Sequence, residues 1–314
     1  MEKQNRSIGK KEVKVPLRDL SKEELYLPGS AACAGCGDGI ALRIALKALG
    51  KDTIFTVPAC CTSVIESSYP NTSFGIPVMN IAFAASAACA SGIRAGLRRQ
   101  GKETQVVVWA GDGATYDIGV ASLSGAWERE TDFLYICYNN QMYSNTGIQR
   151  SGATPFGAWT TTTWKGKEES EKDMIAIAMA HHLPYIATAT IGYPEDLHRK
   201  VQKAKSIPGP KYIEILSPCP PGWRYDMSKT VEMSKLSIAT GVWALLEVEE
   251  GNITFNGRSK AILEGKIKPK PVEDWLSGQG RFAHLFKPKR DEERIKKFEE
   301  IIDQKWQRHR EGKL

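Results

Sequence analysis

The stretch Gln105–Gly113, which reads QVVVWAGDG, decides the expected fold of this chain. Its apolar run shows no polar alternation, as is typical of a strand that a parallel sheet buries on both faces. Gly111-Asp112-Gly113 follows at the end of that strand, where open parallel sheets bind their ligands. The next apolar run, Phe133–Tyr138, leads directly into Asn139-Asn140. The two patterns therefore predict polar groups that meet at the carboxyl edge of one sheet.

Short β-rich runs recur along the chain and alternate with segments of helical periodicity. This alternation predicts an α/β fold with a doubly wound, mainly parallel sheet of about six strands. The strands are expected at Thr53–Ala59, Pro77–Phe83, Gln105–Ala110, Phe133–Tyr138, Tyr185–Thr190 and Lys211–Leu216. The crossover helices are expected at Gly39–Leu49, Ala84–Arg99, Ile118–Glu128, Asp173–His182, Pro194–Ser206 and Val231–Leu246.

The expected domain organisation has three parts. An N-terminal arm covers residues 1–30, an α/β domain covers residues 31–222, and a helical and extended C-terminal region for subunit contacts covers residues 223–314. The second boundary is set by the turn Ser217–Gly222, because its three prolines cannot continue a strand. Within the last part, Asp291–Arg310 predicts an amphipathic helix whose single apolar stripe needs a cover. That stripe consists of Ile295, Phe298, Ile302 and Trp306.

Composition excludes several classes of protein. The chain has 314 residues, 41% of them hydrophobic, which is ample for a buried core. No run approaches the roughly 18 apolar residues of a membrane span, and Met1–Asp19 is polar and basic, so we expect a cytoplasmic protein. Much of the net charge of +7 lies after Lys266. Because no aromatic platform accompanies these basic residues, they favour docking of a partner subunit over nucleic-acid binding.

The Gly-Asp-Gly and Asn-Asn pair predicts a diphosphate and Mg²⁺ site. Glycines allow the backbone to approach phosphate closely, and Mg²⁺ takes about six hard oxygen ligands. The Asp112 carboxylate, the Asn140 side-chain oxygen and the backbone carbonyl near Met142 would supply three of them. Asp-Gly and Asn-Asn are also ordinary turn sequences. Their joint placement after consecutive strands is what favours the cofactor site. The long stretch Asn140–Trp164, rich in Ser, Thr, Gly and Asn, is expected to form its rim.

The seven cysteines predict a second site. Cys33 and Cys36 form a Cys-x-x-Cys pair in a turn of small residues, and the remaining ligands are expected from Cys60 or Cys61 and from Cys219. Four thiolates would hold an iron–sulfur cluster. Zinc bound by four thiolates, a redox dithiol and inert thiols are the alternatives. Two further cysteines, Cys89 in a helix and Cys137 in a strand, are interpreted as small buried hydrophobic residues.

Together these residues resemble the thiamine diphosphate-binding β subunit of the 2-oxoacid:ferredoxin oxidoreductase family, to which pyruvate:ferredoxin oxidoreductase belongs. The resemblance covers nearly the whole chain. Its matching stretches are Cys33–Gly37, Ala110–Gly113 with Asp117–Gly119, Tyr143–Ser151 with Ala153–Pro155, Pro218–Pro220, and Gln279–Phe282.

The resemblance also implies roles for individual residues. It favours Cys61 over Cys60 as the third cysteine of a [4Fe-4S] cluster that Cys33, Cys36, Cys61 and Cys219 hold. It places Asn145 near the reactive thiazolium carbon and in contact with substrate. The implied thiamine diphosphate-binding residues are Gly111, Asp112, Gly113, Asn140, Met142, Thr146 and Cys61, with Asp112, Asn140 and Met142 on Mg²⁺.

The expected function is oxidative decarboxylation of a small, pyruvate-like 2-oxo acid, with single electrons passing from thiamine diphosphate to the cluster and on to ferredoxin. The resemblance implies an α subunit that supplies the pyrimidine-activating glutamate and basic substrate-binding residues. It also implies a ferredoxin-like γ/δ subunit or fusion, an external ferredoxin, and CoA for a pyruvate-like acid. Glu66 is the nearest acidic residue by motif and is interpreted as structural or part of the rim.

Two departures from the family pattern open an alternative substrate. Asn139 and Gln141 stand where relatives often have Asp and Glu, and Thr62-Ser63 follows Cys61 where many have an apolar residue and Glu. Fewer carboxylates suggest a less negative pocket, which makes CoA-independent oxidation of oxalate to CO₂ an alternative. A non-redox thiamine lyase or synthase, and a zinc-stabilised scaffold subunit, are the further alternatives.

Overall fold

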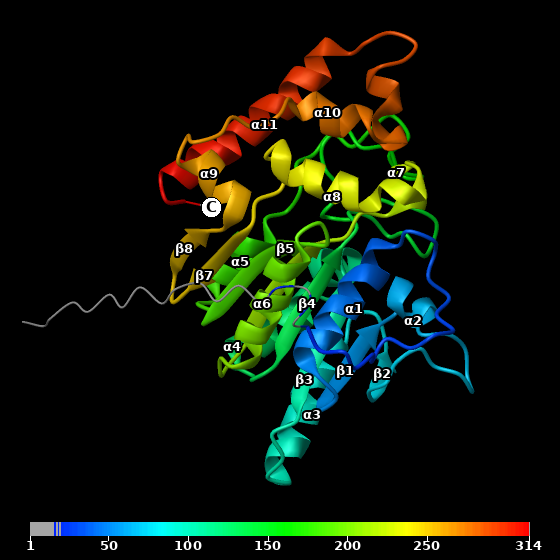
Figure 1. Ribbon diagram of the computed structural model, residues 1–314, viewed down its shortest axis with the longest axis vertical. Helices are drawn as coiled ribbons and strands as arrows, with labels where there is room; N and C mark the ends of the chain where they lie inside the picture. Colours follow the sequence, from blue (N-terminus) through cyan, green and yellow to red (C-terminus); the bar gives the residue numbers. More distant parts are fainter. Residues whose placement is uncertain (1–15, 17, 19, 314) are drawn as a thin grey trace, which may run out of the picture.

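The computed structural model describes residues 16, 18 and 20–313, so part of the expected N-terminal arm lies outside the described residues. Its centre is one sheet with the strand order β2-β1-β3-β4-β6-β5-β7-β8 (Figure 1). The strands are β1 (Thr53–Pro58), β2 (Val78–Ile81), β3 (Gln105–Gly111), β4 (Leu134–Asn139), β5 (Tyr185–Thr190), β6 (Lys211–Leu216), β7 (Leu246–Glu249) and β8 (Asn252–Phe255). The first six are parallel, and β7 and β8 are antiparallel to their neighbours.

The structure confirms the predicted α/β fold class and extends its sheet from about six strands to eight. The two added strands form a hairpin from the C-terminal part of the chain, where the sequence pattern predicted a helix reaching Leu246. The helix α8 (Thr230–Ala239) ends earlier. The hairpin turn is Glu250-Gly251, and both residues have positive φ, at 49° and 82°. Such a turn matches the twist of a two-residue β-hairpin, so the short strands on either side can pair.

The helices cover both faces of the sheet. Alternate residues of β3 enter different cores: Val107 and Trp109 pack with α1 and α6, whereas Val106 and Val108 pack with α3 and α4. This alternation explains the uninterrupted apolar run, because neither side of the strand meets solvent. The helices are α1 (Gly37–Leu49), α2 (Cys61–Ile65), α3 (Ser86–Arg99), α4 (Val120–Glu128), α5 (Met174–Ala180), α6 (Pro194–Lys205), α7 (Pro220–Trp223), α8, α9 (Gly257–Leu263), α10 (Val272–Ser277) and α11 (Glu292–Arg310).

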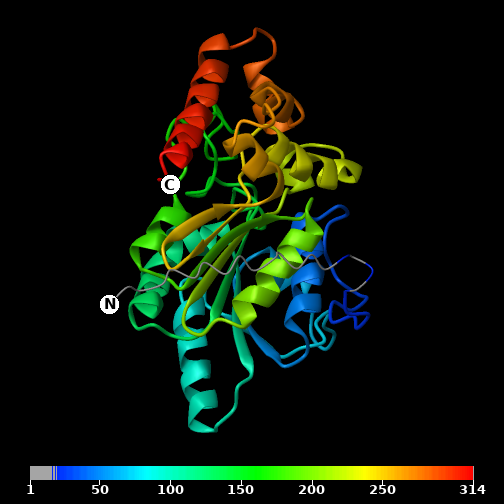
Figure 2. The same cartoon turned by 60° about the vertical axis from the view of Figure 1, so that its left-hand side comes forward.

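The C-terminal helices gather at one end of the molecule, beside the green segment that follows β4 (Figures 1 and 2). The apolar stripe of α11 is buried against this chain itself, as the hydrogen bond from Trp306 Nε1 to the carbonyl of Gly241 (2.8 Å) shows. The division of the chain at residue 222 stays a prediction. None of the helices in the described part of the chain combines the length and hydrophobicity that a bilayer crossing requires.

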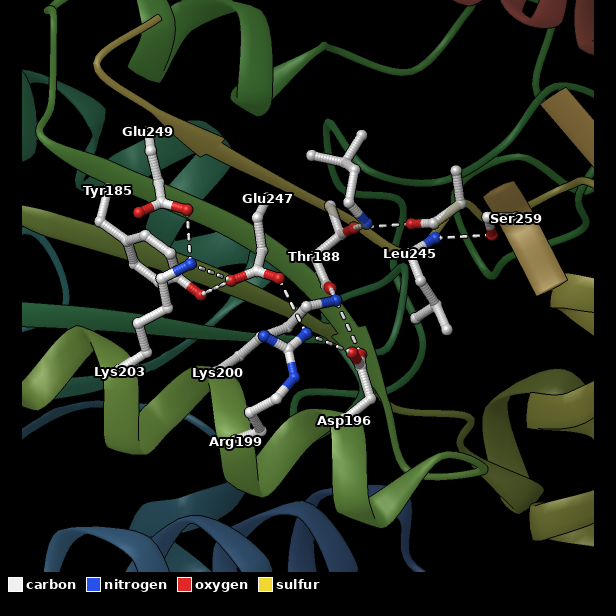
Figure 3. A network of polar contacts seen from close by, with 12 residues as sticks. Tyr185, Thr188, Asp196, Arg199, Lys200, Lys203, Leu245, Glu247, Glu249 and Ser259 are labelled. Carbon is white, nitrogen blue, oxygen red and sulfur yellow. Dashed lines mark hydrogen bonds and ion pairs between the residues drawn. The ribbon is translucent and has the colours of Figure 1, made fainter. Parts of the chain in front are cut away.

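A buried ionic network fixes the antiparallel strand β7 to helix α6 (Figure 3). The Glu247 carboxylate of β7 accepts hydrogen bonds from Arg199 (2.8 Å), Lys203 (2.9 Å) and the hydroxyl of Tyr185 (2.8 Å). Burial raises the pKa of Glu247, but the hydrogen bonds from Arg199 and Lys203 outweigh it and hold the pKa at about 2. The network therefore joins the added strands to the parallel sheet through a carboxylate that is ionised at neutral pH.

Candidate functional site

The order of the central strands brings the predicted site residues to one edge of the sheet. Strands β1, β3, β4 and β6 are consecutive neighbours and parallel, so their carboxyl ends lie in a row. Cys61 follows β1, Asp112 follows β3, Asn140 follows β4 and Cys219 follows β6. Gly111 of β3 pairs directly with Tyr138 of β4. The expectation that Asp112 and Asn140 would meet at adjacent strand ends is thus realised.

Asp112 is the acidic centre of this edge. Its side chain is buried, and its two oxygens accept hydrogen bonds from the hydroxyl of Ser151 and from the backbone N–H of Asn140 (3.2 Å). Burial raises the pKa of this carboxyl to about 7. A nearby cation would favour the ionised form and bring the pKa down again. The surroundings therefore suit a carboxylate that shares its site with a positive ion.

The side-chain amide of Asn140 and the carbonyl oxygen of Met142 lie close to Asp112. One terminal atom of the Asn140 amide lies 3.1 Å from Asp112 Oδ1 and 2.8 Å from the carbonyl oxygen of Met142. If that atom is the amide nitrogen, it donates hydrogen bonds to both oxygens. If the amide is turned so that its oxygen takes this position, the oxygens of Asp112, Asn140 and Met142 face one another. An Asn side chain can take either orientation. A carboxylate, an amide oxygen and a carbonyl are ligands that Mg²⁺ prefers, so these residues fit the predicted ion.

Gly113 and a π-helical turn shape the other side of Asp112. The turn covers Gly113–Ile118 and closes with a hydrogen bond from the N–H of Gly119 to the carbonyl of Ala114 (3.0 Å). A Cβ atom at Gly113 would collide with the ring of Tyr143, whose hydroxyl donates to the carbonyl of Gly113 (3.2 Å). Turns of this kind often occur at functional sites. Only glycine permits this close contact between the Gly-Asp-Gly turn and the segment after β4.

A cavity of about 140 Å³ opens beside Asp112, and we call it the Asp112 cavity. Every predicted thiamine diphosphate-binding residue, including Thr146, lines this cavity. Asn145 lines it as well. Its lining residues are Ala59, Cys60, Cys61, Phe83, Gly111–Ala114, Tyr138, Asn140 and Met142–Thr146. The hydroxyl of Thr146 donates to the side chain of Gln149 (2.7 Å), so the rim segment folds back on itself here.

The four predicted cluster cysteines line a second cavity, of about 330 Å³, which we call the cysteine cavity. Cys61 faces it and Cys60 does not, while Cys89 and Cys137 lie elsewhere. The Cys-x-x-Cys turn is joined to the Pro-rich turn by a hydrogen bond from the N–H of Gly37 to the carbonyl of Pro218 (3.2 Å). The four ligand candidates, Cys33, Cys36, Cys61 and Cys219, are all free thiols.

The spacing of these thiols distinguishes between kinds of metal site. Among the residues that the structure describes, no three His, Cys, Asp or Glu side chains come close enough together to hold a single metal ion. Zinc–sulfur bonds of about 2.3 Å would require the thiolates to be nearly in contact. Thiols spread around a cavity leave room for a larger inorganic core. Burial raises the pKa of Cys36 to about 12 and also raises those of Cys61 and Cys219.

The two cavities share a wall. Cys61, Asn140, Ser144 and Asn145 line both of them. The amide of Asn145 also donates to the carbonyl of Cys60 (3.5 Å), so the rim segment crosses directly from one site to the other. Groups bound in the two cavities would be separated by no more than one layer of side chains.

Sequence reasoning missed the residues that support the site from a distance along the chain. Ser151 binds Asp112, and Asp117 accepts hydrogen bonds from Tyr143 (3.1 Å) and from the N–H of Gly152 (2.8 Å). Asp117, Tyr143 and Ser151 lie within the stretches that resemble the family. That resemblance was the one indication in the sequence that they belong to the site. Their roles, however, depend on contacts between segments that are far apart in the sequence.

None of the positions that depart from the family pattern, Asn139, Gln141 and Thr62-Ser63, lines either cavity. The amide of Asn139 donates to Glu214 (2.6 Å), and the side-chain oxygen of Gln141 accepts a hydrogen bond from Arg281 (2.7 Å). Neither Asn139 nor Gln141 belongs to the lining of either cavity. Their neutral side chains therefore do not make the pocket wall less negative, and they no longer favour oxalate as the substrate.

Comparison with known proteins defines the class first. Residues 59–215 match the family model of the thiamine pyrophosphate enzyme C-terminal TPP-binding domain. The fold resembles that of 2-oxoglutarate:ferredoxin oxidoreductase from Magnetococcus marinus, with a TM-score of 0.55 at 20% identity over 69% of this chain and 79% of that chain. The match covers the sheet edge that carries Asp112 and Asn140, so this is a thiamine pyrophosphate-binding domain.

Closer relatives then give the family. The chain is 46% identical to pyruvate synthase subunit PorB of Methanothermobacter marburgensis, covering 90% of this chain and 96% of the relative. It is 42% identical to ketoisovalerate oxidoreductase subunit VorB of Pyrococcus horikoshii, covering 91% and 92% respectively. The chain belongs to the thiamine diphosphate-binding β subunits of the 2-oxoacid:ferredoxin oxidoreductases, which are oxidoreductases that work within multi-subunit complexes.

Proposed function

We propose that this subunit carries thiamine diphosphate, Mg²⁺ and one [4Fe-4S] cluster, and that its complex oxidatively decarboxylates a small, pyruvate-like 2-oxo acid. The observation that supports this most is the shared wall of Cys61, Asn140, Ser144 and Asn145 between the Asp112 cavity and the cysteine cavity. A non-redox thiamine enzyme needs only the first cavity. Two adjoining cavities suit a reaction in which electrons leave the organic cofactor for a cluster.

The residues of this chain would bind and orient the cofactors and the substrate. Asp112, Asn140 and the carbonyl of Met142 would hold Mg²⁺ with its diphosphate, because the Asn140 amide lies within 3.1 Å of Asp112 Oδ1 and 2.8 Å of the Met142 carbonyl oxygen and can turn its own oxygen toward a bound ion. Cys33, Cys36, Cys61 and Cys219 would hold the cluster. Asn145 lies in both cavity walls and would contact the substrate near the thiazolium ring. Thiamine diphosphate supplies the carbanion chemistry when it is bound.

The rest of the active site would come from partner chains. Among the described residues that line the two cavities, none is Glu, Lys, Arg or His. The described part of the chain therefore offers neither the glutamate that activates the aminopyrimidine nor a cation for the substrate carboxylate at these cavities, and we assign both to an α subunit. A ferredoxin-like subunit or fusion would carry electrons to an external ferredoxin, with CoA as the acyl acceptor. Seven free cysteines agree with work in the reducing cytoplasm.

Turnover of the purified complex tests the proposal. The complex is incubated with pyruvate, 2-oxoisovalerate, 2-oxoglutarate or oxalate, each with and without CoA, and reduction of ferredoxin is followed together with thiamine, iron and sulfide content. We expect CoA-dependent reduction with one or more of the 2-oxo acids and little with oxalate. Bound thiamine diphosphate without iron and sulfide in this subunit would instead identify a non-redox enzyme. Zinc without thiamine diphosphate would identify a scaffold.

A further inference from the structure

Arg281 is a buried cation in the C-terminal part of the chain, and no carboxylate pairs with it within the described residues. Its guanidinium stacks 3.9 Å from the ring centre of Trp223 and lies 5.3 Å from that of Trp275. Burial lowers the pKa of Arg281, and the faces of these rings offset part of that cost through cation–π attraction. One nitrogen, Nη1, has no hydrogen-bond partner among the described residues.

One of the two hydrogen bonds that the guanidinium makes reaches the turn after β4, and the other stays within the C-terminal part of the chain. Nε donates to Gln279 (2.8 Å), and Nη2 donates to the side-chain oxygen of Gln141 (2.7 Å). The ring on which Arg281 stacks contacts the same turn, because Trp223 Nε1 donates to the carbonyl of Asn140 (2.8 Å). Trp223 and Arg281 therefore bind two successive residues of the turn, Asn140 and Gln141.

Gln141 has a backbone conformation that explains why such support is needed. Its φ is 65°, in the left-handed region that residues other than glycine seldom adopt. Its N–H donates to the side chain of Asn139 (2.9 Å), and its carbonyl accepts from the hydroxyl of Thr154 (2.7 Å). The left-handed residue turns the chain between Asn140 and Met142, which brings the Asn140 amide to 2.8 Å from the carbonyl oxygen of Met142 and to 3.1 Å from Asp112 Oδ1.

We propose that Arg281 is a positioning residue: it holds Gln141 in the left-handed conformation that brings the Asn140 amide and the Met142 carbonyl close to Asp112. Through this turn it sets the affinity for Mg²⁺ with diphosphate, and the inference rests on the Mg²⁺ site of the proposed function. Residues that orient metal ligands from behind change metal affinity by about 10–100-fold when they are removed. The C-terminal region thereby contributes to a site that it does not line.

Mg²⁺ binding to the complex tests this role. The complex is depleted of metal with a chelator, and Mg²⁺ is titrated in the presence of thiamine diphosphate, with calorimetry as the readout. We expect Arg281→Met to weaken Mg²⁺ binding by about 10–100-fold with unchanged iron content. Arg281→Lys, which keeps one donor, should fall between that variant and the natural protein. Arg224→Met is the matched control, because Arg224 stacks on Trp159 (3.6 Å) in the same region without contacting the turn.

A second substitution tests whether Arg281 acts by positioning Gln141 or only by packing in the core. Glycine adopts positive φ readily, so the double variant Arg281→Met/Gln141→Gly should recover part of the lost Mg²⁺ affinity. The variant Asp112→Asn tests whether the proposed Mg²⁺ site exists. If Asp112→Asn binds Mg²⁺ as tightly as the natural protein, the proposed Mg²⁺ site is wrong. If Asp112→Asn loses binding while Arg281→Met keeps it, or if the added Gln141→Gly change recovers no affinity, the positioning role is overturned and the site stands.

Discussion

At the scale of single residues, short motifs located the site because the chemistry of each motif is local. Gly111-Asp112-Gly113 and the Asn pair lie at strand ends, and strand ends can be read from apolar runs. Ser151 and Arg281 were not assigned a role in the site, because each reaches it from a segment far along the chain. Arg281, for example, binds a residue 140 positions away. No local pattern marks such a contact.

The choice between Cys60 and Cys61 gives a prediction at this scale. Only Cys61 faces the cysteine cavity, whereas Cys60 contacts Ser63 (4.0 Å). We expect Cys61→Ser to lose most of the iron and sulfide of the cluster in this subunit and Cys60→Ser to keep them. Metal analysis and electron paramagnetic resonance of the reduced complex measure this. Equal iron loss in both variants, or loss in Cys60→Ser alone, would reverse the assignment.

Ser151 gives a second residue-scale prediction. Its hydroxyl donates to the buried Asp112 carboxylate and stabilises the oxygen that turns away from Asn140. Because removal of a hydrogen bond to a metal ligand typically costs 10–100-fold in affinity, we expect Ser151→Ala to weaken Mg²⁺ binding by about tenfold. Equilibrium titration with Mg²⁺ measures it, and Ser206→Ala, at an exposed position after α6, serves as the control. An unchanged affinity would show that this hydroxyl does not support the ligand.

At the scale of elements, periodicity predicted all six parallel strands but not the hairpin β7–β8. The parallel strands other than β2 have six or seven residues and are almost entirely buried, whereas each hairpin strand has four residues and carries exposed positions. Leu246 and Val248 of β7 are buried in the core, and the ionic network of Glu247 joins the same strand to α6 (Figure 3). Such a network forms only after α6 and β7 have met, so the sequence pattern does not reveal it.

This network predicts a pH dependence of stability. The pKa of Glu247 is about 2 in the folded chain against an ordinary 4.5, so its contribution is complete above pH 4.5 and is lost as pH falls toward 2. The shift corresponds to about 3 kcal/mol. We expect Glu247→Gln to lower the free energy of unfolding by about that amount at pH 7 and by much less at pH 3. Urea unfolding measures the difference.

The control for this prediction is Glu249→Gln. Glu249 binds the same Lys203, but its side chain is 50% exposed, so water screens the pair and its removal should cost less than 1 kcal/mol. If Glu247→Gln and Glu249→Gln destabilise the protein equally, or if the effect of Glu247→Gln does not shrink in acid, the buried pair does not anchor β7.

At the scale of the whole molecule, the Asp112 cavity and the cysteine cavity have no Glu, Lys, Arg or His among the described residues that line them. This distribution predicts the behaviour of Glu66, the nearest acidic residue by motif. Its carboxylate binds the amide of Asn80 and lines neither the Asp112 cavity nor the cysteine cavity. We therefore expect Glu66→Gln to change kcat of the complex less than threefold. Loss of a general acid–base group costs about 10²–10⁴-fold, so the two outcomes are well separated.

Steady-state turnover with the preferred 2-oxo acid measures this, and Asn145→Ala is the positive control, because Asn145 lies in both cavity walls and should lower kcat. Thiamine diphosphate content is determined for each variant, so that a loss of binding is not mistaken for a loss of chemistry. If Glu66→Gln abolished turnover with the cofactor still bound, the activating carboxylate would belong to this chain. The division of labour with an α subunit would then be wrong, because the β subunit would carry a complete thiamine site by itself.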